Sequence, residues 1–113
     1  MSSKTALGID FGGSGIKGAP VDIKSGKLLD ERFRIPTPEP STPEAVAKTI
    51  KELVRHFKWK GVVGCGFPAV VQNGIVRSAA NIDKSWVNIN ARKLFSDTTK
   101  LRVWVANDAD VAG

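Results

Sequence analysis

Residues 8–18, GIDFGGSGIKG, constrain the fold more than any other stretch, because they gather five of the chain's eleven glycines. Residues 13–18 match the G-x-G-x-x-G spacing of a dinucleotide-binding turn, which must open directly into a helix. Pro20 would break such a helix after roughly one turn. The P-loop spacing also fails, because an isoleucine rather than a glycine precedes Lys17. The segment therefore predicts a tight hairpin between two strands.

A glycine hairpin of this kind can bind phosphate. Its backbone N–H groups converge with no side chains in the way, which makes a nest for phosphate oxygens. Ser14 adds a hydroxyl donor, Lys17 adds a positive charge, and Asp10 can hold a hydrated Mg²⁺ beside the phosphates. The turn alone leaves an alternative open, in which the glycines only supply positive φ and both charged side chains are solvated.

Apolar runs and turn signals predict the first half of the fold. Strands are expected over residues 5–11, 16–23 and 28–35, with a tight turn at 24–27. The stretch 36–43 holds four prolines and is expected to be an extended connection. Thr42, Pro43 and Glu44 then mark the start of a helix. Its expected apolar face comprises Val46, Ile50, Leu53, Val54 and Phe57, and its charged face comprises Lys48, Lys51, Arg55 and Lys58.

The second half alternates strands with a hairpin and a helix. A buried strand is expected over 62–67, and Gln72-Asn73-Gly74-Ile75 is a strong hairpin signal. A weak helical pattern follows over 91–100, and another apolar strand over 102–106. The predicted fold class is therefore α/β, with three antiparallel strands extended by parallel strands with helices.

Composition narrows the classes of function. The chain has 17 Lys and Arg against 11 Asp and Glu, and this net charge of +6 indicates a polyanionic partner without choosing one. One cysteine, Cys65, excludes an internal disulfide and is typical of the reducing cytoplasm; we expect it to be a buried, inert thiol. With His56 as the single histidine, expected near the surface, no zinc site can be assembled within these residues. No stretch reaches the ~18 apolar residues of a membrane span.

A second polar site follows the last predicted strand. Asn107 and Asp108 come directly after the apolar run 103–106, at the end of a strand where ligands bind in open α/β sheets. A carboxylate there can accept the proton of an attacking hydroxyl while the amide positions the same molecule. Capping of a following helix explains the pair equally well.

Three segments resemble the ROK family (repressors, open reading frames and kinases) of sugar kinases. "LGIDFGGSGIKG" is similar to its first phosphate motif, "GFPAVVQNGIVRSAANIDKSW" to its middle segment and "VWVANDADVAG" to its catalytic segment. The stretches "ERFRIPTPEPSTPE" and "SAANIDKSW" resemble the subgroup that uses inorganic polyphosphate. The resemblance implies an actin-like, ribonuclease-H-like domain of the sugar kinase superfamily.

The resemblance also implies roles for individual residues. Asp108 matches the catalytic base, and Asn107 and Asn81 match residues that bind the sugar. The phosphate loop is matched by Gly12, Gly13, Ser14 and Lys17, with Asp10 near the Mg²⁺, bound through water. Ser14 replaces the family's usual threonine and keeps the hydroxyl.

The implied reaction is transfer of a terminal phosphoryl group from polyphosphate, or ATP, to the 6-hydroxyl of glucose. Residues 1–113 are then expected to be an N-terminal ATPase-like domain that ends before a second domain, inactive alone, in a cytoplasmic enzyme that forms a homodimer and binds neither nucleic acid nor membrane. Three alternatives remain: a strictly ATP-dependent hexose or amino-sugar kinase, a non-catalytic sugar-sensing regulator, and a stand-alone piece that folds but has no activity.

Overall fold

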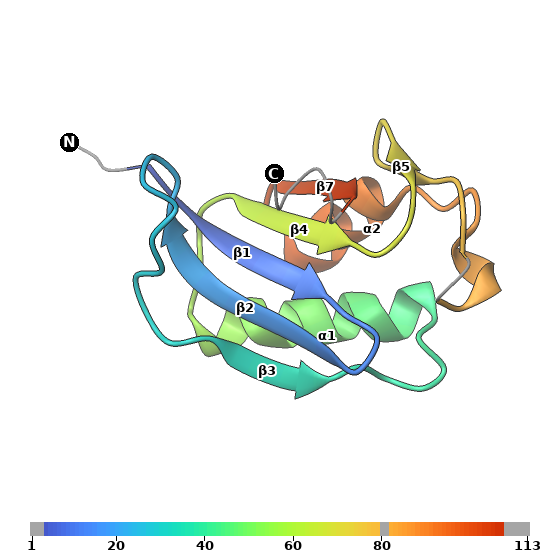
Figure 1. Ribbon diagram of the computed structural model, residues 1–113, viewed down its shortest axis with the longest axis horizontal. Helices are drawn as coiled ribbons and strands as arrows, with labels where there is room; N and C mark the ends of the chain where they lie inside the picture. The colour runs from blue at the N-terminus through green and yellow to red at the C-terminus, as the bar shows by residue number, and fades with distance from the viewer. Residues whose placement is uncertain (1–3, 80–81, 108–113) are drawn as a thin grey trace.

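A five-stranded mixed sheet forms the centre of the computed structural model, which describes residues 4–79 and 82–107 (Figure 1). The strand order is β3-β2-β1-β4-β7. β1 pairs antiparallel with β2 and parallel with β4, and β4 pairs parallel with β7. The predicted α/β class is confirmed. The strands are β1 (Thr5–Phe11), β2 (Gly15–Asp22), β3 (Phe33–Pro36), β4 (Val63–Phe67) and β7 (Val103–Asn107).

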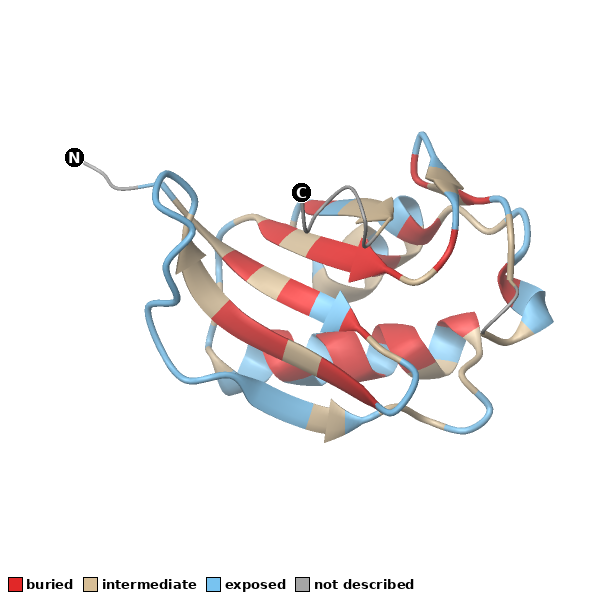
Figure 2. Cartoon of the chain, viewed as in Figure 1, coloured by how far each residue is buried: buried red, intermediate tan, exposed pale blue. Residues whose placement is uncertain are grey.

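Two helices cover one face of this sheet. Both α1 (Pro43–His56) and α2 (Ala91–Thr99) lie on the same side in Figure 1, and they pack against each other. Alternate residues of the strands point into the core between the sheet and the helices, as the bands in Figure 2 show. Fully buried side chains of this core include Leu7, Phe11, Ile16, Ile50, Leu53, Phe67 and Phe95. Cys65 is buried there too, as expected.

The start of α1 follows the sequence signal. The Thr42 hydroxyl accepts a hydrogen bond from the Ala45 N–H at 3.3 Å, and Pro43 occupies the first turn. The predicted apolar face is confirmed, with Phe57 partly buried just beyond the helix end. His56 is exposed in the last turn, and its ring stacks on Phe33 with 3.8 Å between centroids.

A hairpin and a short helical turn connect β4 to α2. β5 (Val71–Gln72) and β6 (Ile75–Val76) flank Asn73 and Gly74, which have φ of 54° and 83° as a tight hairpin turn requires. The 3₁₀ turn η1 (Lys84–Trp86) follows. It places the Trp86 ring in the core, against Phe11 and Phe67.

The third strand is shorter than expected. Residues 28–32 leave the ladder apart from one bridge between Leu28 and Val21, and Leu28 and Leu29 are exposed. Pro20 explains the break. The Pro20 carbonyl accepts a hydrogen bond from the Leu29 N–H at 2.8 Å. The Pro20 ring nitrogen has no hydrogen, so it cannot donate a second bond to the segment that contains Leu29. Among the helices of the described residues, none has the length and apolar character needed to cross a bilayer.

Trp86 provides a test of this core. Its Nε1–H donates to the Ser41 carbonyl at 2.7 Å, and its side chain is fully buried. We expect Trp86→Phe to lower the free energy of unfolding by about 1–3 kcal/mol, because the Ser41 carbonyl loses its donor. The matched change Trp104→Phe, at a side chain that is 54% exposed, should cost about 0.5 kcal/mol or less. Urea unfolding followed by circular dichroism measures both, and equal losses would contradict this account of the core.

Candidate phosphate-binding site at the carboxyl edge of the sheet

The three parallel strands bring their carboxyl ends to one edge of the sheet. In the register, Asp10 of β1 lies beside Gly66 of β4, and Gly66 lies beside Ala106 of β7. Asn107 follows one position later, beside Phe67. Strands lie about 5 Å apart, so the backbones at Asp10 and Ala106 are about 10 Å apart. The predicted phosphate loop and the predicted sugar-binding amide therefore share one edge.

The turn between β1 and β2 is a hairpin, as predicted. The Gly12 N–H donates to the Gly15 carbonyl at 2.9 Å and closes the turn. Across residues 4–79 and 82–107, no acceptor binds the N–H of Gly13 or of Ser14, and both residues are exposed. Two adjacent backbone donors at the tip of the turn are thus open to an anion.

Close approach, rather than positive φ, explains the first glycine of this turn, Gly12. The described glycines with positive φ are Gly26 and Gly74, so positive φ is not the reason for glycine at residues 12–15. A Cβ on Gly12 would lie 2.9 Å from the Gly15 carbonyl oxygen, which is backbone and cannot easily move. A Cβ on Gly13 would meet nothing within 4 Å, so the space above Gly13 is open.

The segment around β3 holds the turn in place. Arg34 Nη2 donates to the Ser14 carbonyl, and the Thr37 hydroxyl donates to the Gly12 carbonyl, both at 2.6 Å. The Thr37 N–H also lies 3.4 Å from the Ser14 carbonyl. Sequence reasoning missed both residues. The signal that could have found them is the pairing of the second and third predicted strands, which brings this segment beside the turn.

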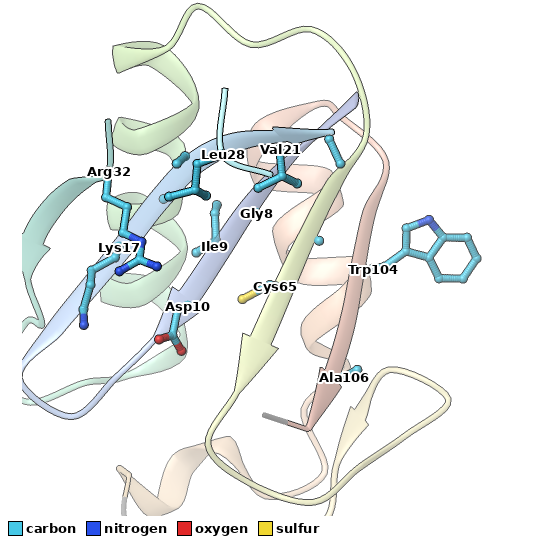
Figure 3. A pocket seen from close by; sticks show the side chains of 14 residues that line it. Gly8, Ile9, Asp10, Lys17, Val21, Leu28, Arg32, Cys65, Trp104 and Ala106 are labelled. Carbon is cyan, nitrogen blue, oxygen red and sulfur yellow. The ribbon is translucent and has the colours of Figure 1, made fainter. Parts of the chain in front are cut away.

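Asp10 and Lys17 are direct cross-strand partners on the sheet face away from the helices. Figure 3 shows their side chains with Arg32 at one end of a depression of about 440 Å³ on this face. Asp10 is exposed, and the structure gives it no salt bridge within the described ranges. Lys17 is half-buried. The second residue pair below the turn thus carries a cation and a carboxylate without a salt bridge among the described residues.

The donor set can be tested against Mg²⁺. Within the described residues, no three His, Cys, Asp or Glu side chains are arranged to hold a metal. Mg²⁺ commonly keeps several waters and binds one or two carboxylates together with substrate phosphates. A single exposed carboxylate at Asp10, in the strand that leads into the β1–β2 turn, fits that pattern.

A second, polar hollow adjoins the turn on its other side. Its volume is about 440 Å³, and its lining includes Gly13, Thr37, Glu39 and Asp83. The Ser85 hydroxyl and the Ser85 N–H both donate hydrogen bonds to the Asp83 carboxylate. These bonds, the one from the hydroxyl most of all, lower the pKa of Asp83 below its usual value. Asp83 therefore presents a negative charge at the rim.

The sugar-binding candidates are only partly described. The Asn107 Nδ2 donates to the Ala69 carbonyl at 2.7 Å, which ties the end of β7 to the segment after β4. By strand alternation Asn107 lies on the helix-covered face, opposite Asp10. Asn81 and Asp108 lie outside the described residues, so their roles remain predictions.

Comparison with known proteins assigns a family. Residues 6–113 match the ROK family. The chain is 49% identical over 113 residues to the polyphosphate glucokinase of Mycobacterium tuberculosis (strain H37Rv), covering 99% of this chain and 43% of that protein. It is 48% identical to the polyphosphate glucokinase of Mycobacterium leprae, covering 35% of it. The chain therefore spans less than half the length of these relatives.

Solved structures agree with the fold. The inorganic polyphosphate/ATP-glucomannokinase of Arthrobacter sp. strain KM superposes with a TM-score of 0.91 at 47% identity, covering 96% of this chain and 46% of that one. A ROK family glucokinase from Streptomyces griseus, in complex with glucose and AMPPNP, gives a TM-score of 0.83 at 30% identity, covering 96% and 35%. The fold is the actin-like fold of these sugar kinases, and the chain belongs to the ROK family.

Proposed function

We propose that this chain is the phosphate-binding N-terminal domain of a glucokinase that transfers a phosphoryl group from inorganic polyphosphate, and also from ATP, to the 6-hydroxyl of glucose. The observation that carries the proposal is the β1–β2 turn, where the N–H groups of Gly13 and Ser14 have no acceptor among the described residues and Lys17 follows in the second residue pair below the turn. The likeness of the chain to polyphosphate glucokinases, at 48–49% identity, supports polyphosphate as the phosphoryl donor.

The proposed mechanism divides the roles along the carboxyl edge. The N–H groups of Gly13 and Ser14, with Lys17, bind the oxygens of the terminal phosphoryl group and offset its charge. Asp108 accepts the proton of the glucose 6-hydroxyl as that oxygen attacks phosphorus, and the bond to the leaving phosphate breaks in line. Asn107 and Asn81 orient the sugar. Asp10 would hold a hydrated Mg²⁺, which would supply further charge neutralisation on the phosphates.

The proposal covers a protein longer than these residues. Positioning of sugar and donor requires groups on both sides of a cleft, so the second side is assigned to a second domain. The proposed enzyme is a cytoplasmic homodimer, in line with the family resemblance.

Asp108→Asn tests the proposed base. In the complete enzyme we expect kcat to fall by at least about 100-fold, because an amide cannot accept the proton, while the fold is kept. Steady-state phosphorylation of glucose, with circular dichroism as the check on folding, measures the effect. Asp97→Asn, at an exposed carboxylate paired with Lys93, is the control with the same chemical change. Near-normal turnover in folded Asp108→Asn would remove Asp108 from this role.

Gly13→Ala and Gly12→Ala separate binding from folding in the turn. The Gly13 Cβ meets no atom within 4 Å, so Gly13→Ala should change the free energy of unfolding by about 0.5 kcal/mol or less. It should raise KM for the phosphoryl donor, because the methyl group fills the space proposed for phosphate. Gly12→Ala should cost about 1–3 kcal/mol, because its Cβ crowds the Gly15 carbonyl at 2.9 Å. A Gly13→Ala enzyme with unchanged donor KM would argue against phosphate at the turn.

The charged face of α1 offers a test of donor length. Lys48, Lys51, Arg55 and Lys58 are exposed as predicted, which also suits an ordinary solvated face. We expect Lys51→Glu with Arg55→Glu to raise KM for long polyphosphate more than for ATP, and the difference to shrink as salt screens the charges. Lys24→Glu with Lys27→Glu, in the exposed turn at the opposite edge of the sheet, is the matched control. Equal effects on the KM of both donors would show that these charges only keep this face of the helix solvated.

A further inference from the structure

Arg34 lies in register with the residues of the proposed phosphate site. It is the cross-strand partner of Lys17, which is in turn the partner of Asp10. Side chains of directly opposed residues leave an antiparallel pair on the same face. Three neighbouring strands therefore present two cations and one carboxylate in a single row, on the face away from the helices.

The Arg34 side chain crosses the base of the turn. Its Nη2 donates to the Ser14 carbonyl at 2.6 Å. A Cβ on Gly15 would touch Arg34 Nε and would lie 2.7 Å from Cζ. Because Gly15 does not have positive φ, space for this guanidinium is the reason that the structure gives for a glycine there.

Most of the Arg34 hydrogen-bonding capacity is not used by the protein. A guanidinium has five N–H donors in a rigid fork. The bond to Ser14 is the one the structure gives for the Arg34 side chain, and no carboxylate among the described residues pairs with it. An exposed guanidinium with open donors is therefore bound to the carbonyl of Ser14, in the same turn that carries the open N–H groups of Gly13 and Ser14.

We propose that Arg34 binds the phosphate chain of the phosphoryl donor, at the phosphate next to the one held by the turn. This inference rests on the proposed function and names a residue that the family resemblance did not assign. The planar fork suits two oxygens of one phosphate, and the bond to the Ser14 carbonyl fixes its position relative to the turn. Gly15 keeps the path of this side chain clear.

Four variants of the complete enzyme test the proposal: Arg34→Gln, Arg34→Lys, Gly15→Ala and the double variant Arg34→Gln with Gly15→Ala. KM and kcat are measured for glucose and polyphosphate at several salt concentrations, and tripolyphosphate binding is measured by calorimetry. The matched control is Arg102→Gln, at an exposed arginine just before the first residue of β7.

We expect Arg34→Gln to raise the donor KM at least about tenfold, with the glucose KM within about twofold, since a charge-assisted bond to phosphate is lost. The slope of log KM for polyphosphate against log salt should fall by about one, because one cation fewer contacts the chain. Arg34→Lys should retain the salt slope but not the full affinity. Gly15→Ala should reproduce most of the Arg34→Gln effect by displacing the guanidinium, and the double variant should be no worse than the worse single variant.

Loss of kcat or thermal stability with an unchanged donor KM and salt slope would overturn the proposal, because a purely structural role predicts that pattern. Equality of Arg34→Gln with Arg102→Gln would also overturn it. If the unsubstituted enzyme phosphorylated no glucose, the proposed function would fail. Calorimetry would then test the role of Arg34 by itself. Weaker tripolyphosphate binding by Arg34→Gln than by the unsubstituted protein would support the proposal, and equal binding would contradict it.

Discussion

The double pairing of β1 is the constraint on which the rest of the structure depends. One edge of this strand pairs antiparallel with β2 and the other pairs parallel with β4. The first pairing forces a tight turn after Phe11, and the second aligns that turn with the ends of β4 and β7. Below the turn, Phe11, Ile16 and Phe67 are fully buried, with 5.2 Å between the ring centroids of Phe11 and Phe67. The exposed loop thus has a rigid apolar base.

A rigid base matters for the chemistry that we propose. Backbone N–H groups bind an anion well when they already point toward it, because little reorganisation is then needed. Arg34 and Thr37 fix the Ser14 and Gly12 carbonyls, and this orients the peptide groups between them. The positive charge of Lys17 is contributed by the neighbouring strand β2. The site is therefore assembled from three successive antiparallel strands of the sheet.

Local signals in the sequence predicted most of the elements. The apolar runs of β1, β4 and β7, the threonine-proline helix start and the Asn73-Gly74 turn all depend on near neighbours, and all three signals are confirmed. The late start of β3 was not predicted, because it arises from the missing N–H of Pro20 across the ladder. Arg34 and Thr37 were missed for a similar reason, since their contacts depend on register between strands. The glycines of the turn were located correctly, but the steric reason for Gly12 and Gly15 appears only in three dimensions.

The central claim, that the β1–β2 turn is an anion-binding nest, can be tested most directly by titrating inorganic tripolyphosphate into ¹⁵N-labelled protein at low salt and following the amide resonances. The account predicts saturable shifts at the Gly13 and Ser14 N–H groups, which have no acceptor within the described residues. The glycine turn at Gly26, whose N–H already donates to the Asp22 carbonyl at 2.7 Å, should not respond. Unmoved Gly13 and Ser14 resonances, or equal shifts at Gly26, would contradict the claim.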